Sequence, residues 1–90
     1  MYFTYVLYSP TSDKIYIGFT SELTNRLMAH NDHRNTGWSS RYQPWELLYS
    51  EEHSTKAEAM QREKQLKSYQ GRGFIRGMIL SKNASHLPGC

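Results

Sequence analysis

Three polar side chains, Arg26, His30 and Glu63, stand where helical spacing predicts apolar faces. Arg26 and His30 share one face with Leu23 and Leu27, and Glu63 lies on the apolar stripe of a later helix. Burying a charge costs several kcal/mol unless the charge is paired. These three residues therefore call for either an internal ion pair or a functional site.

The three side chains fit either a functional site or a purely structural role. A glutamate offers the hard oxygen that divalent cations prefer, and an arginine offers a planar fork for phosphate, so together they suit a metal and phosphate site. The structural alternatives are an internal pair between Arg26 and Glu63, with His30 satisfied in the core, and a surface pair between Glu63 and Lys67 at i, i+4.

Positive charge concentrates in the C-terminal third of the chain. The net charge is +3, but the segment 62–82 carries six basic residues and one acidic residue. A basic segment suits a polyanion, although a solvated helix surface has the same composition. The residues predicted to contact nucleic-acid phosphates are Arg62, Lys64, Lys67, Arg72, Arg76 and, in a long loop, Arg34 and Arg41.

The elements that must position these residues are those of a single small domain. The chain has 90 residues, of which 38% are hydrophobic and 13% aromatic, which excludes a multidomain enzyme and a disordered chain. The order β-β-α-β-α-α predicts an α+β fold, with a three-stranded antiparallel sheet flanked by helices. We expect strands over 2–8, 15–19 and 45–49, helices over 22–31 and 55–69, and a short last helix from Phe74.

Local signals set the expected element ends. Thr20 and Ser21 are predicted to cap the first helix, and a Thr55-x-x-Glu58 capping box opens the second. The triplet 71–73, Gly-Arg-Gly, is predicted to interrupt the helical structure between the second helix and the last helix. The predicted domain covers residues 1–82, followed by a flexible tail over 83–90.

The predicted location is cytoplasmic. No apolar run approaches the roughly 18–20 residues of a membrane span. The first residues lack the features of a secretory signal, and the single cysteine, Cys90, cannot form an internal disulfide.

The motifs become specific when their spacing is considered. The triplet Tyr16-Ile17-Gly18 is followed by Arg26, then His30, and by a helical Glu63. With Tyr5 upstream, this pattern over residues 2–80 resembles the GIY-YIG nuclease domain. The resemblance is to small, stand-alone bacterial members of the family, which are related to the N-terminal domain of a component of the bacterial repair excinuclease.

The resemblance implies a role for each matching residue. Glu63 would hold one divalent metal ion, Mg²⁺ or Mn²⁺, and Arg26 would stabilise the phosphate. Tyr16 or His30 would act as the general base, and Tyr5 and His30 would position water or phosphate. Two departures bear on activity: the first triplet is 3–5, Phe-Thr-Tyr, and Phe19 follows the second triplet, where some relatives carry a lysine.

The implied function is a metal-dependent endonuclease that hydrolyses DNA phosphodiester bonds in repair or processing. The chain has no room for a second DNA-binding domain, so we expect a structure-directed or non-specific enzyme, acting on branched, damaged or single-stranded DNA. A protein partner is a further source of specificity. The alternative is a catalytically weak or silent nucleic-acid-binding module that acts with a partner protein.

Overall fold

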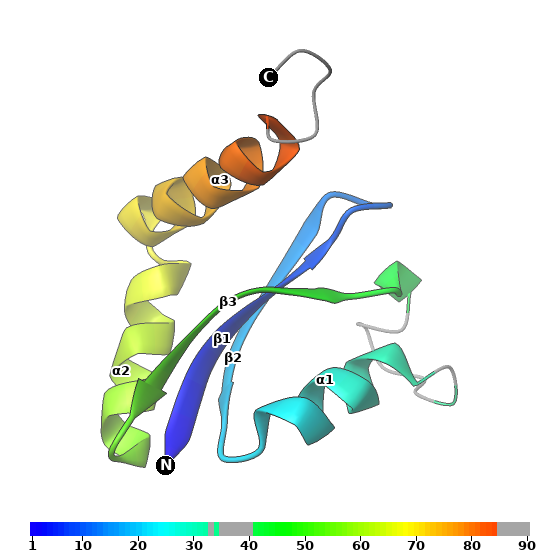
Figure 1. Ribbon diagram of the computed structural model, residues 1–90. Coiled ribbons are helices and arrows are strands. Elements are labelled where there is room, and N and C mark those ends of the chain that lie inside the picture. The colour runs from blue at the N-terminus through cyan, green and yellow to red at the C-terminus, as the bar shows by residue number, and fades with distance from the viewer. Residues whose placement is uncertain (33, 35–40, 85–90) are drawn as a thin grey trace.

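The fold follows the predicted order of elements. The computed structural model describes residues 1–32, 34 and 41–84. The elements are β1 (Tyr2–Ser9), β2 (Lys14–Thr20), α1 (Leu23–Asn31), β3 (Glu46–His53), α2 (Lys56–Lys67) and α3 (Tyr69–Ala84) (Figure 1). The predicted α+β fold is therefore confirmed. Residues 85–90 of the predicted tail lie outside the described part of the chain.

The sheet has β1 at its centre. The strand order is β2-β1-β3, and both pairings are antiparallel. Tyr5 lies opposite Gly18 of β2, and Leu7 lies opposite Tyr16. Because β1 is paired on both sides, its residues from Thr4 to Ser9 are all buried.

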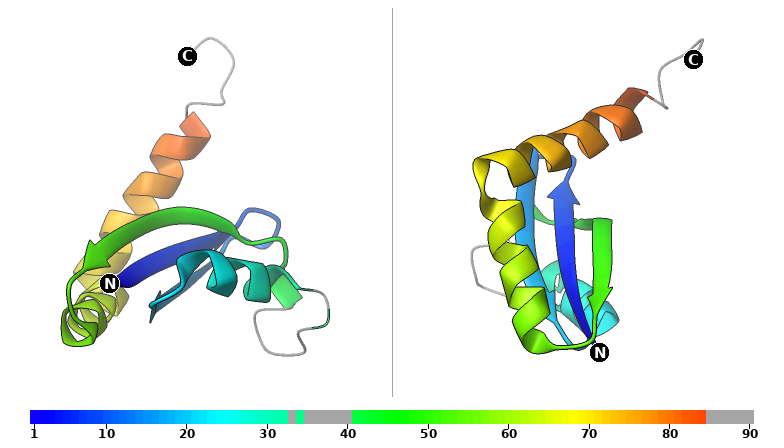
Figure 2. Two further views of the ribbon diagram at one scale, coloured as in Figure 1. Left: turned by 60° about the horizontal axis from the view of Figure 1, so that its bottom comes forward. Right: turned by 90° about the vertical axis from the view of Figure 1, so that its left-hand side faces the viewer.

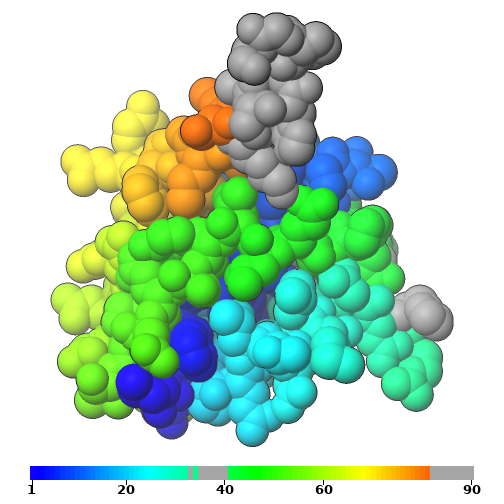
Figure 3. Space-filling model, in the orientation of Figure 1, coloured from blue at the N-terminus to red at the C-terminus, as the bar shows by residue number. Residues whose placement is uncertain are grey.

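Side chains of β1 alternate between the two faces of the sheet, and each face has its own helical cover (Figure 2). Val6 and Tyr8 pack on α2 and α3, in a core with Leu66, Ile75 and Ile79. Tyr5 and Leu7 face the other way, toward α1, in a second core with Trp45, Tyr16, Leu23, Leu27 and Tyr42. Little of β1 reaches the face seen in Figure 3, because β3 and α1 cover it.

The helix starts depart from the prediction in one case. Thr55 caps α2 as expected, and its Oγ1 accepts a hydrogen bond from the Glu58 N–H at 3.2 Å. At α1 the N-cap is Glu22, without a side-chain cap. Thr20 ends β2, and its hydroxyl instead accepts from the Glu22 N–H at 3.1 Å, so it braces the strand-to-helix turn.

The third strand is longer than predicted. It runs from Glu46 to His53, whereas the sequence predicts a strand over 45–49. Leu47 lies outside the core, since it is 40% exposed. The pairing of β1 with β3 shifts register between Val6 and Leu7, and β3 is an edge strand, so part of its apolar pattern faces solvent.

The break between the last two helices is not at the glycine triplet. It falls at Ser68, whose ψ of 169° is extended, and α3 continues through the triplet to Ala84. A Cβ on Gly71 would lie 2.5 Å from both Cα and O of Leu66 and would also meet the Gln65 carbonyl. Gly71 is therefore a close-approach residue, which lets the first turn of α3 cross the end of α2.

This junction carries a stability prediction. Replacing Gly71 with alanine should destabilise the protein by about 3 kcal/mol or more, because the new Cβ meets backbone atoms that cannot turn aside. Gly77 lies in the same helix with nothing within 4 Å of its Cβ position. The matched Gly77→Ala change should therefore be neutral or stabilise by about 0.5–1 kcal/mol. Urea unfolding of both variants measures the difference, and similar midpoints would contradict it.

No helix in the described ranges is long and apolar enough to cross a membrane.

Candidate active site

Three of the predicted site residues meet on the α1 side of the sheet. Tyr5 and Tyr16 come from neighbouring strands, and their rings stack with centroids 6.1 Å apart. His30, at the end of α1, places its ring 4.4 Å from that of Tyr16. The Tyr5 hydroxyl lies 3.4 Å from Nε2 of His30. The topology thus joins two strands and a helix at one aromatic and imidazole cluster.

Gly18 makes this cluster possible. It sits opposite Tyr5 in the sheet, and a Cβ at this position would lie 2.8 Å from the Tyr5 hydroxyl oxygen. The same Cβ would lie 3.1 Å from a ring carbon of Tyr16. The glycine of the second triplet therefore provides the space in which the two tyrosine side chains approach each other.

Two members of the cluster, Tyr5 and His30, are held in their neutral forms. Burial raises the pKa of the Tyr5 phenol, the neighbouring Tyr16 adds to the rise, and the charge of Arg26 opposes it. Burial, and secondly the charge of Arg26, lowers the pKa of His30. At neutral pH Tyr5 is therefore a hydrogen-bond donor, and His30 is a neutral imidazole that can accept a proton.

The burial of His30 predicts a pH dependence of stability. With its pKa lowered in the folded state, His30 binds fewer protons when folded than when unfolded, over a window that lies below about pH 6.5. The free energy of unfolding should therefore fall as the pH drops through that window. Melting temperatures at about pH 7.5 and about pH 5 measure the loss.

A substitution isolates this contribution. His30→Gln should shrink the difference between the two melting temperatures, because the group that must gain a proton is gone. His53→Gln is the matched control histidine, and it should leave the contribution of His30 in place. An equal pH response in wild type and His30→Gln would contradict the assignment.

Arg26 and Glu63 lie at the margin of the cluster. The expectation that all three polar residues are buried is wrong: His30 is buried, Arg26 is exposed, and the side chain of Glu63 is 21% exposed. The charges of both Arg26 and Glu63 act on Tyr5, Arg26 lowering and Glu63 raising its pKa. The two charges therefore act on the same hydroxyl with opposite signs.

Glu63 is paired along its own helix. Its Oε1 lies 2.8 Å from Nζ of Lys67, the i, i+4 pair that the sequence allowed. Among the ion pairs of the described residues, none joins Arg26 to Glu63. The Glu63 carboxylate is thus paired with the ammonium group of a flexible lysine side chain. A divalent cation can displace that ammonium group.

The donor set suits a hydrated divalent cation. Within the described ranges, no group of three His, Cys, Asp or Glu side chains is placed to hold a metal ion. Mg²⁺ does not need such a group, since it keeps several waters and takes one or two carboxylates together with substrate phosphates. Glu63 supplies one half-buried carboxylate of this kind.

Asn31 and Trp45 support the cluster in a way that sequence reasoning missed. Nδ2 of Asn31 donates to the Trp45 carbonyl at 2.9 Å, and the Trp45 N–H donates to Oδ1 of Asn31. This pair of hydrogen bonds fixes Trp45, which is 2% exposed and contacts Tyr16 with ring centroids 6.3 Å apart. The adjacency of Asn31 to His30 was the only sequence signal.

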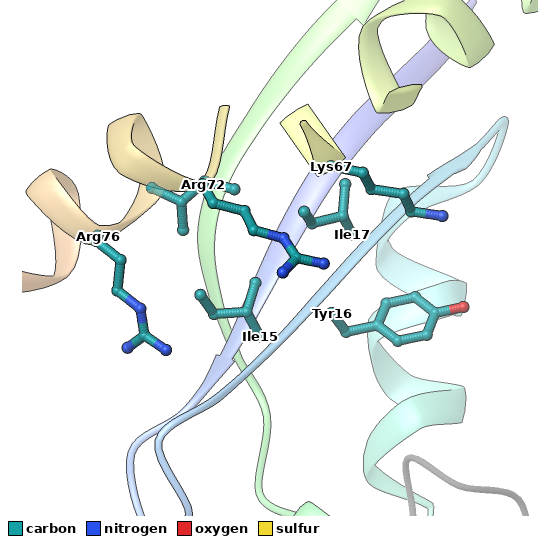
Figure 4. Close-up of a pocket in the computed structure, with 7 residues that line it drawn as sticks. Ile15, Tyr16, Ile17, Lys67, Arg72 and Arg76 are labelled. Atoms are coloured by element: carbon teal, nitrogen blue, oxygen red, sulfur yellow. The ribbon is translucent and has the colours of Figure 1, made fainter. Parts of the chain in front are cut away.

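The basic residues predicted to bind nucleic acid separate into groups. Lys67, Arg72 and Arg76 line one pocket of about 380 Å³ together with Tyr16 (Figure 4). This group joins the tyrosine cluster to the start of α3. Of the basic residues predicted to bind nucleic acid, these three lie beside Tyr16 of the candidate active site.

The remaining members of the set lie elsewhere. Arg62 is bound to Glu51 of β3 at 2.9 Å, and Arg34 is paired with Asp32 at 2.8 Å. Lys64 on α2 and Arg41 before β3 are both exposed. Arg62 and Arg34 already have carboxylate partners, so these two cations offer less free positive charge to a polyanion.

Comparison with known proteins finds similar chains. Residues 1–74 match the family model of the GIY-YIG catalytic domain. A UPF0213 protein of Bacillus pumilus (strain SAFR-032) is 36% identical over 75 residues, covering 80% of this chain and 76% of the relative. A UPF0213 protein of Bacillus velezensis is 33% identical over 89 residues, covering 96% and 89%.

A solved structure shares the fold. The solution NMR structure of a UPF0213 protein from Bacillus halodurans matches with a TM-score of 0.50 and 21% sequence identity. The match covers 87% of this chain and 85% of that chain.

Proposed function

The chain belongs to the GIY-YIG family of nucleases, and from this premise we propose that it is a metal-dependent endonuclease that hydrolyses DNA phosphodiester bonds. The observation that carries the proposal is the cluster of Tyr5, Tyr16 and His30, with Arg26 and Glu63 at its margin. DNA repair or processing is the role that suits a small nuclease of this kind.

Glu63 would hold the divalent cation, Mg²⁺ or Mn²⁺, after releasing Lys67. When bound, such a cation neutralises charge on the phosphate and on the leaving oxygen. Arg26 is exposed beside the cluster, so its guanidinium can reach a phosphate from solvent and stabilise the charge that develops on the equatorial oxygens.

The cluster of Tyr5, Tyr16 and His30 would carry out the proton transfer. Tyr16 would accept the proton of the attacking water as its phenolate, the form that nearby positive charge favours, and the neutral His30 beside it is the alternative acceptor. Tyr5 keeps its proton, because burial raises its pKa, so it can donate a hydrogen bond but does not act as the base. Tyr5 is therefore a positioning residue, which orients His30 or the substrate.

A second function has its own supporting observation. Phe3 and Thr4 replace two residues of the first family triplet, and Phe19 replaces a residue that is lysine in some relatives. A chain that bound DNA without cutting it, in the company of a protein partner, would tolerate these changes. The complete set of Tyr16, Arg26 and Glu63 favours the nuclease.

Cleavage of a mixed DNA panel tests the proposal. Labelled single-stranded, duplex and branched DNAs are incubated with Mg²⁺ or Mn²⁺, and with EDTA. We expect internal cuts that need the metal and vanish with the chelator. Intact DNA under every condition, together with measurable binding, would overturn the nuclease in favour of the silent binding module.

A further inference from the structure

The pocket beside Tyr16 has an apolar floor. Ile15 and Ile17 of β2 and Ile75 of α3 line it, together with the three cations named above (Figure 4). Ile75 is fully buried, but Ile15 and Ile17 are only half-buried, so apolar surface remains open along the edge strand. A pocket of about 380 Å³ falls within the range of sites for small ligands, about 300–1,000 Å³.

The three cations on this pocket differ in availability. Lys67 is paired with Glu63 at 2.8 Å, and Arg76 with Asp13 at 3.0 Å. Among the described residues, no ion pair or side-chain hydrogen bond engages the guanidinium of Arg72. Figure 4 shows this guanidinium projecting into the pocket. Arg72 is thus a free phosphate-binding fork above an apolar floor.

The combination of an apolar floor and a guanidinium group indicates which class of ligand fits the pocket. Phosphates alone need positive charge and no apolar floor, whereas a nucleotide presents a flat apolar base and an anionic phosphate. A base inside a duplex is stacked and paired, so only a base outside the helical stack can lie against the isoleucines. Tyr16 borders the same pocket, which puts the bound nucleotide next to the proposed scissile phosphate.

We propose that this pocket binds one unpaired nucleotide beside the cleaved bond, with its base on Ile15 and Ile17 and its phosphate on Arg72. Single-stranded or locally unpaired DNA is then the preferred substrate. The proposal rests on the proposed nuclease function for its placement relative to the cut. Binding itself is separable from cleavage.

The test compares two DNAs and two pairs of matched variants. In a Glu63→Gln background, affinities are measured for a single-stranded oligonucleotide and for a duplex of the same sequence. Ile15→Thr keeps a β-branched residue in the strand and removes apolar surface, with Leu47→Thr on the opposite edge strand as its control. Arg72→Ala removes one charge, with the exposed Lys56→Ala as its control.

We expect the single strand to bind more tightly, and Ile15→Thr to weaken that binding by about five- to tenfold while leaving duplex affinity unchanged. Arg72→Ala should weaken single-strand binding more than Lys56→Ala does. Methyl NMR signals of Ile15, Ile17 and Ile75 should shift when a short oligonucleotide is added. Equal losses of affinity for single-stranded and duplex DNA, or methyl signals that do not shift, would overturn the proposal that this pocket binds a nucleotide.

The outcomes separate this proposal from the nuclease. Metal-dependent cleavage with no effect of Ile15→Thr on substrate preference would overturn the pocket and leave the nuclease standing. Selective single-strand binding that Ile15→Thr abolishes, in a protein that cuts no DNA, would support the pocket and overturn the nuclease.

Discussion

Replacing Glu63 with glutamine should abolish DNA cleavage, by about a thousandfold or more, because the carboxylate proposed to hold the divalent cation becomes a neutral amide of the same size. DNA affinity should not fall. The change removes a negative charge and releases Lys67, which lies on the pocket beside Tyr16. Single-turnover cleavage and equilibrium binding of the same labelled DNA measure both effects.

The control for this variant is another carboxylate with no part in the site. Glu52 on β3 is exposed, and Glu52→Gln changes the net charge by the same amount. It should cut at the wild-type rate. Wild-type cleavage by Glu63→Gln would show that Glu63 does not hold the metal ion, and a loss of DNA affinity would show that the carboxylate shapes the binding surface.

Replacing Tyr16 with phenylalanine should slow cleavage by about 10²–10⁴-fold, the usual contribution of a general base. The ring contacts with Tyr5 and His30 are kept, since only the hydroxyl is removed. Folding and DNA affinity should therefore stay close to wild type, and the loss should appear in the rate constant of the chemical step.

Tyr42 supplies the matched control. Its ring contacts Trp45 in the same aromatic core, so Tyr42→Phe removes a hydroxyl from a similar setting. This variant should cut normally. If Tyr16→Phe also cuts at nearly the wild-type rate while His30→Gln does not, the proton acceptor is His30 and the assignment to Tyr16 is wrong.

The aromatic and β-branched composition of residues 2–8 was enough to predict the first strand. Val6 and Tyr8 alternate with Tyr5 and Leu7, and this period of two places the pairs on opposite faces of any sheet. The capping box at Thr55 likewise depends on residues three positions apart. Such signals lie within a few residues of each other, so the local sequence contains them in full.

The spacing of the family motifs also named the candidate site residues. Their catalytic roles remain predictions, but the three aromatic and imidazole members do meet, because the hairpin places Tyr5 and Tyr16 on one face and α1 brings His30 to them. The sequence also allowed the pair between Glu63 and Lys67 without choosing it over a pair with Arg26.

The tertiary structure alone decided how the local pieces meet. Gly71 looks like a helix breaker in the sequence, and only the crossing of α3 over Leu66 shows that it is a close-approach residue inside a helix. The pocket of Ile15, Tyr16 and Arg72 joins a strand to a helix more than fifty residues later. Burial and charge pairing depend on neighbours that are distant in sequence, and packing, unlike periodicity, leaves no local pattern to read.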